Sequence, residues 1–290
     1  MSSKSCLYAA VLAALLGLAG PAHADADELK ARHGAITEQL AHSPFQRPLV
    51  LESTENAGDL KGEIYAVMDH PFATIGGALK QPDNWCDVLI LHLNVKQCRV
   101  NGNMLAVAIG RKYDQPVAEA YKVDFNYKVA AQSADYLHVQ LSADAGPLGT
   151  RNYRIGFEAV PLDAKRSFIR MSYSYGYGFA ARMAMQGYLA TIGSGKVGFS
   201  VVGRNADGSP ILIDNVRGVV ERNTMRYYLA IDSYLDSLST PAGEQVEKRL
   251  RDWFAATERY PKQLHEMERD EYMTMKRKEV KRQQEPAPQS

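Results

Sequence analysis

Hydrophobic and polar side chains alternate along several stretches in the middle of the chain. Between Tyr121 and Val129, every odd position is apolar or aromatic and every even position is Lys, Asp or Asn. The same alternation returns over Leu137–Leu141, Tyr153–Ala159 and Arg166–Tyr177. Successive side chains of a strand point to opposite faces of a sheet. Because the connecting segments are short, the pattern predicts an antiparallel meander with one buried face and one wet face.

Other helices and strands are expected on both sides of this meander. Before it, we expect an amphipathic helix within Asp25–Ser43, strands over Gly62–Met68, Val88–Val95 and Met104–Gly110, and a helix over Phe72–Leu79. After it, we expect helices over Gly178–Tyr188, Asn223–Leu238 and from Pro241 onward, and a hairpin of Val197–Val202 with Pro210–Ile213. Asn223 is the expected N-cap of its helix.

The first 24 residues have the pattern of a secretory signal peptide. Lys4 precedes an apolar run, Tyr8–Leu18, and Ala22-His23-Ala24 has the small-x-small spacing of a cleavage site. The apolar run is too short to span a bilayer. We therefore expect the protein to be exported through this signal peptide to the periplasm.

The cysteine content agrees with export. Removal of the signal peptide would leave Cys86 and Cys98. A pair of cysteines in an oxidising compartment indicates a disulfide, and two buried thiols are the alternative. Their spacing does not match that of metal-ligand cysteines.

Motifs for catalysis, cofactors and nucleic acids are weak. Gly176–Ala181 formally matches the dinucleotide fingerprint, but the strand before it belongs to an antiparallel meander rather than to a βαβ unit. The histidines are scattered and Gly-x-Ser-x-Gly is absent. The chain has 34 Lys and Arg against 33 Asp and Glu, so nothing favours nucleic-acid binding. We expect no cofactor, no metal and no catalytic residue identifiable from sequence.

The predicted inward face of the meander is rich in tyrosine. A sheet packed on helices usually carries Val, Ile and Leu, because a buried phenol needs a partner for its hydroxyl. The tyrosines therefore favour a partly hydrated cavity that binds a small molecule, and a large aromatic core is the alternative. The expected ligand-binding residues are Tyr121, Phe125, Tyr127, Tyr153, Phe157, Met171, Tyr173, Tyr175, Tyr177, Met183 and Tyr228.

A basic run lies near the C-terminus. It consists of Lys276, Arg277, Lys278, Lys281 and Arg282, with Glu279 among them. This composition favours a solvated helix. It leaves transient contact with an anionic membrane surface open.

The order of elements resembles the helix-grip fold of START-like and polyketide-cyclase-like lipid-binding domains (the Bet v 1 type). The resemblance lies in Gly62–Cys98, where a strand leads through the segment HPFATIGGALKQPDNWC to a Trp, and in the meander and helix that follow. It implies an α+β fold in which a curved antiparallel sheet grips a long C-terminal helix. It also implies a cavity for a lipid or sterol-like molecule between the sheet and that helix.

The resemblance divides the chain into segments. Residues 1–24 are the signal peptide, 25–60 a helix and extended lead-in, and 61–240 the START-like domain. Residues 241–282 form a helical extension and 283–290 a disordered tail.

Three functions follow from this organisation. The leading hypothesis is an exported carrier of a hydrophobic small molecule or lipid. The alternatives are an enzyme that uses a tyrosine or His92 in the same cavity, and an envelope-assembly partner that docks through Pro241–Lys281. The sequence leaves the oligomeric state undetermined.

Overall fold

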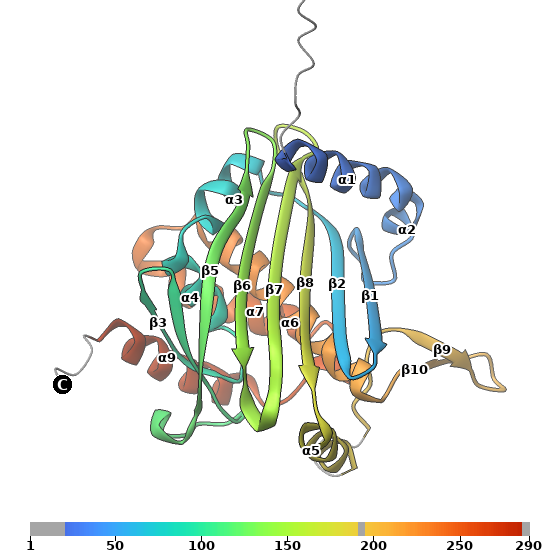
Figure 1. The fold of residues 1–290 in the computed structure, drawn as a ribbon, viewed down its shortest axis with the longest axis vertical. Helices are drawn as coiled ribbons and strands as arrows, with labels where there is room; N and C mark the ends of the chain where they lie inside the picture. The colour runs from blue at the N-terminus through green and yellow to red at the C-terminus, as the bar shows by residue number, and fades with distance from the viewer. Residues whose placement is uncertain (1–20, 191–194, 286–290) are drawn as a thin grey trace, which may run out of the picture.

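An antiparallel sheet of eight strands forms the centre of the protein (Figure 1). The computed structural model describes residues 21–190 and 195–285. The strand order is β1-β2-β8-β7-β6-β5-β4-β3, so β2 pairs with β8 and the meander runs outward from there. The strands are β1 (Leu49–Asn56), β2 (Asp59–Met68), β3 (Val95–Asn101), β4 (Met104–Ile109), β5 (Tyr121–Gln132), β6 (Leu137–Ala145), β7 (Thr150–Pro161) and β8 (Ser167–Tyr177). The predicted curved antiparallel sheet of an α+β fold is confirmed.

One long helix, α6 (Val216–Ser237), packs across the inner face of this sheet. It contacts β1, β2 and β8, and Figure 1 shows it behind the strands. Gly62 of β2 permits the close approach, because a Cβ at this position would lie 2.2 Å from Thr224 Oγ1 of α6. Helices α3 (Phe72–Leu79) and α4 (Pro82–Leu89) cover the adjoining part of the core. The sheet therefore grips α6, as the resemblance implied.

The outer face of the sheet is only partly wet. Helices α1 (Pro21–Ala35) and α2 (Thr37–Ala41) lie across it and form a second, smaller core. Leu29 of α1 and Leu40 of α2 pack there with Tyr65 and Phe168. The expectation of one apolar and one wet face is therefore wrong at this end of the sheet, because α1 and α2 cover outward side chains of β2 and β8.

The segment Val88–Val95, expected to be a strand, is helical at its start. Pro82 stands in the first turn of α4, and the helix continues to Leu89. Turns follow before β3 begins at Val95. Val88, Leu89, Ile90, Leu91 and Leu93 are all buried. A short, fully buried apolar run does not distinguish a strand from a helix by periodicity, so the strand prediction is wrong here.

Helix α6 begins at Val216, about two turns before its expected start at Asn223. Asn215, not Asn223, is the N-cap, and its side chain accepts a hydrogen bond from the backbone N–H of Arg217. Asn223 lies inside the helix, where its side-chain oxygen is 3.4 Å from Arg226 Nη1. The predicted cap at Asn223 is therefore wrong, and the gripped helix is longer than expected.

Between β8 and α6 lie α5 (Phe179–Ala190) and a short ribbon of β9 (Val201–Arg204) and β10 (Pro210–Leu212). The predicted helix is confirmed. The predicted hairpin also forms, but its first strand is Val201–Arg204 instead of Val197–Val202. In Figure 1 the ribbon projects from one side of the molecule and α5 lies at the end of β8. After α6 come α7 (Ala242–Thr257), the short α8 (Pro261–Leu264) and α9 (Arg269–Gln284).

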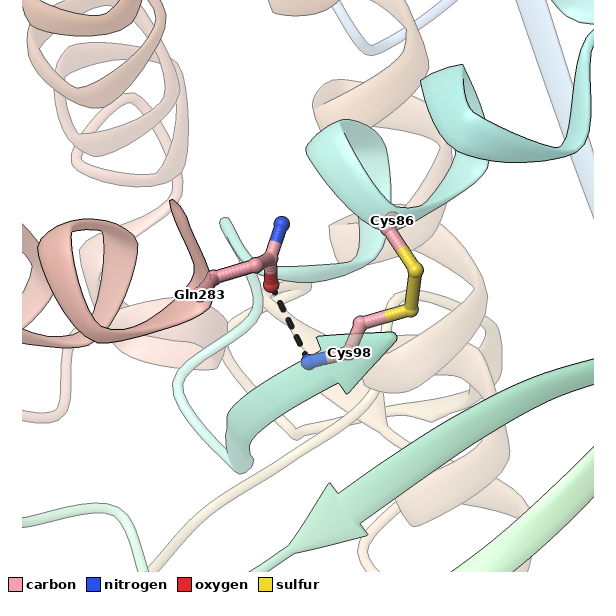
Figure 2. The surroundings of a disulfide bond; sticks show 3 residues. All are labelled: Cys86, Cys98 and Gln283. Atoms are coloured by element: carbon pink, nitrogen blue, oxygen red, sulfur yellow. Dashed lines mark hydrogen bonds between the residues drawn. A yellow bond between two sulfur atoms is a disulfide. The ribbon is translucent and has the colours of Figure 1, made fainter. Parts of the chain in front are cut away.

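Helix α9 packs beside the edge strand β3, next to a disulfide that joins Cys86 of α4 to Cys98 of β3 (Figure 2). The Cα atoms of the two cysteines are 5.2 Å apart. Gln283 Oε1 accepts a hydrogen bond from the backbone N–H of Cys98 at 3.0 Å. An edge strand exposes unpaired backbone groups that other chains can pair with, and α9 covers this one. Gln283, expected to begin the disordered tail, therefore belongs to α9.

The basic run of α9 does not form one solvated face. Lys276 and Glu279 are fully buried with Lys96 of β3. Glu279 Oε2 lies 2.7 Å from Lys276 Nζ, and Glu279 Oε1 lies 3.1 Å from Lys96 Nζ. Burial lowers the pKa of Lys276 to about 8 against the opposing effect of Glu279. Part of the run that was expected to face solvent or lipid instead fixes α9 to the sheet.

Residues 1–20, which hold most of the expected signal peptide, lie outside the described part of the chain. The small residues of the expected cleavage site, Ala22 and Ala24, fall within the range of α1. Of the helices in the described residues, none is long and apolar enough to cross a membrane.

Candidate functional site

Four tyrosines meet between the inner face of the sheet and α6. Tyr153 comes from β7, Tyr173 and Tyr175 from β8, and Tyr227 from α6. The ring centroids of Tyr153 and Tyr175 are 5.3 Å apart, and those of Tyr173 and Tyr227 are 5.2 Å apart. We call these four residues the tyrosine cluster.

The strand alternation and the sheet register create this cluster. Tyr173 and Tyr175 are two residues apart, so both point inward from β8. Tyr173 pairs with Ile155 of β7, and Tyr153 is two residues before Ile155 on the same face. The three phenols are thus neighbours on one face before any helix is added.

The sequence predicted Tyr228, but α6 turns Tyr227 toward the sheet tyrosines. Tyr228 is buried elsewhere, with the guanidinium of Arg47 5.0 Å from its ring centroid. Adjacent helix residues differ by about 100° in direction, so only one of them can face the cluster. The rotation of α6 about its axis decides which one, and the apolar pattern of the helix did not reveal it.

Within the cluster, the hydroxyls differ in their partners. Tyr153 Oη lies 2.8 Å from Thr150 Oγ1, and Tyr175 Oη lies 3.8 Å from Met185 Sδ of α5. No hydrogen bond joins the hydroxyl of Tyr173 or Tyr227 to another described residue. The buried hydroxyl of Tyr228, outside the cluster, has no hydrogen-bond partner either. Burial raises the pKa of Tyr173 well above its ordinary value, and the neighbouring phenols Tyr153, Tyr227 and Tyr175 add to the effect. These phenols therefore stay protonated near neutral pH and are hydrogen-bond donors.

Most of the other predicted residues lie on the inner face around the cluster. Phe125 is 6.3 Å from Tyr153 between ring centroids, and Tyr127 donates to the backbone oxygen of Leu79 at 3.2 Å. Tyr177 donates to Glu55. Phe157 and Met171 are completely buried.

The expected interior position of Tyr121 is wrong, and Met183, expected to line the ligand site, is exposed as well. Tyr121 is the first residue of β5 and is 51% exposed. Met183 lies on the outward side of α5 and is 52% exposed. Strand parity gives the direction of a side chain, but it does not say how far along the strand the covering helices reach.

In this structure the cluster rings pack against one another, as in the aromatic-core alternative to a cavity. An open pocket of about 490 Å³ lies at the α5 end of the inner face. Its lining residues are Glu55, Ala57, Gly58, Tyr177, Gly178, Phe179 and Arg182. Phe179 is 80% exposed beside it. The tyrosines thus extend from this pocket into the space under α6.

At the other side of the cluster, Tyr227 stacks on His92. Their ring centroids are 4.9 Å apart with an interplanar angle of 29°. His92 is buried, and burial is the main reason why its pKa is well below the ordinary value. The cationic side chains Arg226, Lys276 and Lys112 lower the pKa further. His92 is therefore a neutral imidazole near neutral pH.

The free energy of unfolding should fall as the pH decreases below 6.5. An unfolded His92 gains a proton near pH 6.5, whereas the buried imidazole resists protonation. The unfolded state then binds more protons, so stability is lost from pH 6.5 down to the lower folded pKa, by at most about 1.4 kcal/mol per pH unit. Urea unfolding between pH 7.5 and 5 measures this slope.

His92→Phe should make this slope shallower than in the wild type. The exposed His42 provides the matched control, because His42→Phe should keep the wild-type slope. Equal slopes in the wild type and His92→Phe would contradict the prediction.

Another pocket, of about 510 Å³, lies on the outer face under α1. Arg170 lines this pocket and pairs with Glu63 at 2.6 Å and with Glu158 at 3.2 Å. Tyr136 donates to Glu158 at 2.9 Å. These groups satisfy one another, which is typical of a structural ion-pair network. Among the described residues, no three His, Cys, Asp or Glu side chains are grouped as metal ligands would be.

The comparisons concern the fold. No protein-family model matches the chain, and no curated protein sequence matches it. Similar solved structures include an aromatase/cyclase from Streptomyces, with 11% identity and a TM-score of 0.34, covering 67% of this chain and 99% of that one. Norcoclaurine synthase from Thalictrum flavum has 13% identity and a TM-score of 0.32, covering 50% and 83%. Human StAR-related lipid transfer protein 5 has 8% identity and a TM-score of 0.31, covering 57% and 90%.

The topology itself identifies the architecture. Strand β2, helices α3 and α4, the meander β3–β8 and helix α6 follow one another along the chain, and β2 closes the sheet beside β8. Strand β1, the ribbon β9–β10 and helices α7–α9 are additions around this arrangement. The chain thus has the helix-grip arrangement, in which a curved antiparallel sheet surrounds a long helix.

Proposed function

We propose that this protein binds and carries a hydrophobic small molecule, a lipid or sterol-like compound, between the sheet and α6. The observation that carries the proposal is the tyrosine cluster. Four phenols occupy a place that aliphatic side chains fill in an ordinary core. The hydroxyls of Tyr173 and Tyr227 make no hydrogen bond to another described residue, and the buried hydroxyl of Tyr228 on the same helix also lacks a partner. A ligand with polar atoms gives these donors a partner, and its apolar surface is buried at about 25 cal/mol per Å².

Helix α5 is the proposed gate to this site. It follows β8 directly and touches the cluster through Met185, while Phe179 and Met183 are exposed. Ligand binding requires the rings to separate, and α5 is the cover whose displacement opens the inner face at the pocket beside Tyr177. Met side chains adapt to varied apolar shapes, which suits a cover over a bound lipid.

Export is part of the proposal. The pattern of residues 1–24 is that of a signal peptide. A disulfide between Cys86 and Cys98 suits an oxidising compartment. We therefore place the carrier outside the cytoplasm, in the periplasm.

Carriage is favoured over catalysis by the state of the phenols. A general base works best with a pKa near the working pH. The pKa of Tyr173 and of Tyr227 is raised, chiefly by burial, so neither phenol suits the role of a general base near neutral pH.

Carriage is also favoured over docking of a partner protein through the C-terminal helices. The apolar residues of α9, among them Tyr272 and Met273, are buried within this chain.

Native mass spectrometry of the purified protein, followed by titration with a fluorescent long-chain fatty acid, tests the proposal. We expect a co-purifying lipid or saturable binding of the probe. The double variant Tyr173→Phe and Tyr227→Phe should bind about 30-fold more weakly, because two hydrogen bonds of about 1 kcal/mol each are lost. Tyr121→Phe, at an exposed phenol, should bind as the wild type does. Protein that is always empty and never saturates with probe would refute the function.

A further inference from the structure

His92 and Arg226 each keep one buried nitrogen without a hydrogen-bond partner. These atoms are Nε2 of His92 and Nε of Arg226, and the residues are 3% and 2% exposed. The backbone N–H of Asn94 donates to Nδ1 of His92 at 3.2 Å. In a neutral imidazole whose Nδ1 accepts, Nε2 carries the hydrogen. Since Arg Nε always carries one, both orphan atoms are donors.

Such donors need an explanation, because a buried donor without a partner costs about 1–3 kcal/mol. The other nitrogens of Arg226 are in use: Nη2 lies 2.7 Å from Glu266 Oε1, and Nη1 lies 3.4 Å from Asn223 Oδ1. The cationic side chains near His92 already have carboxylate partners: Arg226 and Lys112 pair with Glu266, and Lys276 pairs with Glu279. The side chain of Asn223 also lies beside the imidazole. The two N–H donors themselves, one of them on a guanidinium, match an acceptor with negative charge.

The position of these donors continues the line of the tyrosine cluster. His92 stacks on Tyr227, Tyr227 contacts Tyr173, and Tyr173 contacts Tyr175 at 5.5 Å. Tyr175 in turn reaches Met185 of α5. A path of aromatic rings therefore runs from α5 inward and ends at His92 with its unpaired Nε2–H. Arg226 is the residue next to Tyr227 on α6.

We propose that Nε2 of His92 and Nε of Arg226 bind the anionic oxygen head group of the hydrophobic ligand, a carboxylate or a phosphate. The apolar part of that ligand lies along the tyrosine cluster, with its far end toward α5. This inference rests on the proposed function and adds the chemical class of the ligand. It predicts an amphiphile with an acidic head, rather than a neutral sterol or ester.

The test compares three probes with the same chain length: hexadecanoate, monohexadecyl phosphate and the neutral methyl hexadecanoate. Calorimetric or competition titrations at pH 7.5 should give at least tenfold tighter binding of one or both charged probes than of the ester. The charged probe that binds more tightly identifies the head group.

Variants at His92 locate the effect. His92→Phe keeps an aromatic ring beside Tyr227 but removes the donor, so we expect the preference for the charged probe over the ester to disappear. His92→Gln restores an N–H donor and should recover part of the preference. His42→Phe is the control and should behave as the wild type.

A measurement on the wild-type protein tests the proposal without requiring that the variants fold. The ¹⁵N resonance of His92 Nε2 should move on addition of hexadecanoate and stay in place with the ester. Equal affinities for the ester and both charged probes, or a preference that survives His92→Phe, would overturn the head-group assignment while leaving the carrier function intact. Failure of all three probes to bind would overturn both.

Discussion

Glu279→Gln is expected to lower the free energy of unfolding by about 3–5 kcal/mol, the usual cost of removing one partner from a buried ion pair. Glu279 is the carboxylate that faces two fully buried ammonium groups, Lys96 and Lys276. Gln has nearly the same shape but no charge, so both ammonium groups stay buried without a counter-ion. Lys276 keeps its bonds to the backbone oxygens of His92 and Val95, which hold the charge in place.

The loss of stability in Glu279→Gln should also depend on pH. Burial lowers the pKa of Lys276 to about 8 in the wild-type protein, and removal of Glu279 lowers it further. At pH 9 the variant then holds a neutral Lys276 that needs no counter-ion, so the difference from wild type should be smaller at pH 9 than at pH 7.

Urea unfolding followed by tryptophan fluorescence measures this effect. Trp253 of α7 stacks on Tyr272 of α9 with ring centroids 5.1 Å apart, so its emission also reports the docking of α9. The matched control is Glu247→Gln, which breaks an exposed pair of α7 with Arg277 of α9. Exposed pairs contribute little, so the control should change stability only slightly. Similar losses in the two variants would contradict the assigned role of the buried cluster.

Removal of the disulfide is expected to cost about 2–4 kcal/mol. Cys86 and Cys98 are separated by 12 residues, and closing a loop of this size restricts the unfolded chain by roughly 3 kcal/mol in the chain-entropy description. The bond ties α4 to β3 at the point where Gln283 of α9 also attaches (Figure 2). Its loss should therefore loosen α4, β3 and α9 together.

The double variant Cys86→Ala and Cys98→Ala tests this expectation against the wild type, with and without dithiothreitol. The urea midpoint of the wild type should fall on reduction, and that of the variant should be low in both conditions. Ala avoids placing a hydroxyl among buried side chains. A midpoint that is unchanged by reduction and by the double substitution would show that the bond does not stabilise the fold.

The candidate site was predictable only in part. Alternation along β7 and β8 placed Tyr153, Tyr173 and Tyr175 on one face correctly, because strand parity is a local property. Their partner on α6 was missed, since a helix rich in apolar and aromatic residues has more than one face that can be buried. The role of His92 could not be predicted from the sequence. Its unpaired donor and its stacking on Tyr227 arise from packing between distant segments.

The sequence by itself determined the sheet. The odd and even positions of Tyr121–Val129 and Arg166–Tyr177, with short polar connections, are sufficient for an antiparallel meander. It also determined the order of most elements around the sheet, with the exception of Val88–Val95, and the spacing of Cys86 and Cys98. These features depend on near neighbours in the chain, whose preferences act in any context.

Only the tertiary structure decided which faces are covered and where the coverage ends. Val88–Leu93 forms the end of a helix and turns instead of a strand. Every side chain there is buried, so the apolar pattern of the sequence could not distinguish the two. Tyr121 is exposed because it is the first residue of β5, beyond the covering helices, and Met183 is exposed on the surface of α5 itself. Lys276 and Glu279 are buried because Lys96 completes their charge pairing from β3. Burial of a side chain depends on partners far away in the chain, and a local pattern holds no information about them.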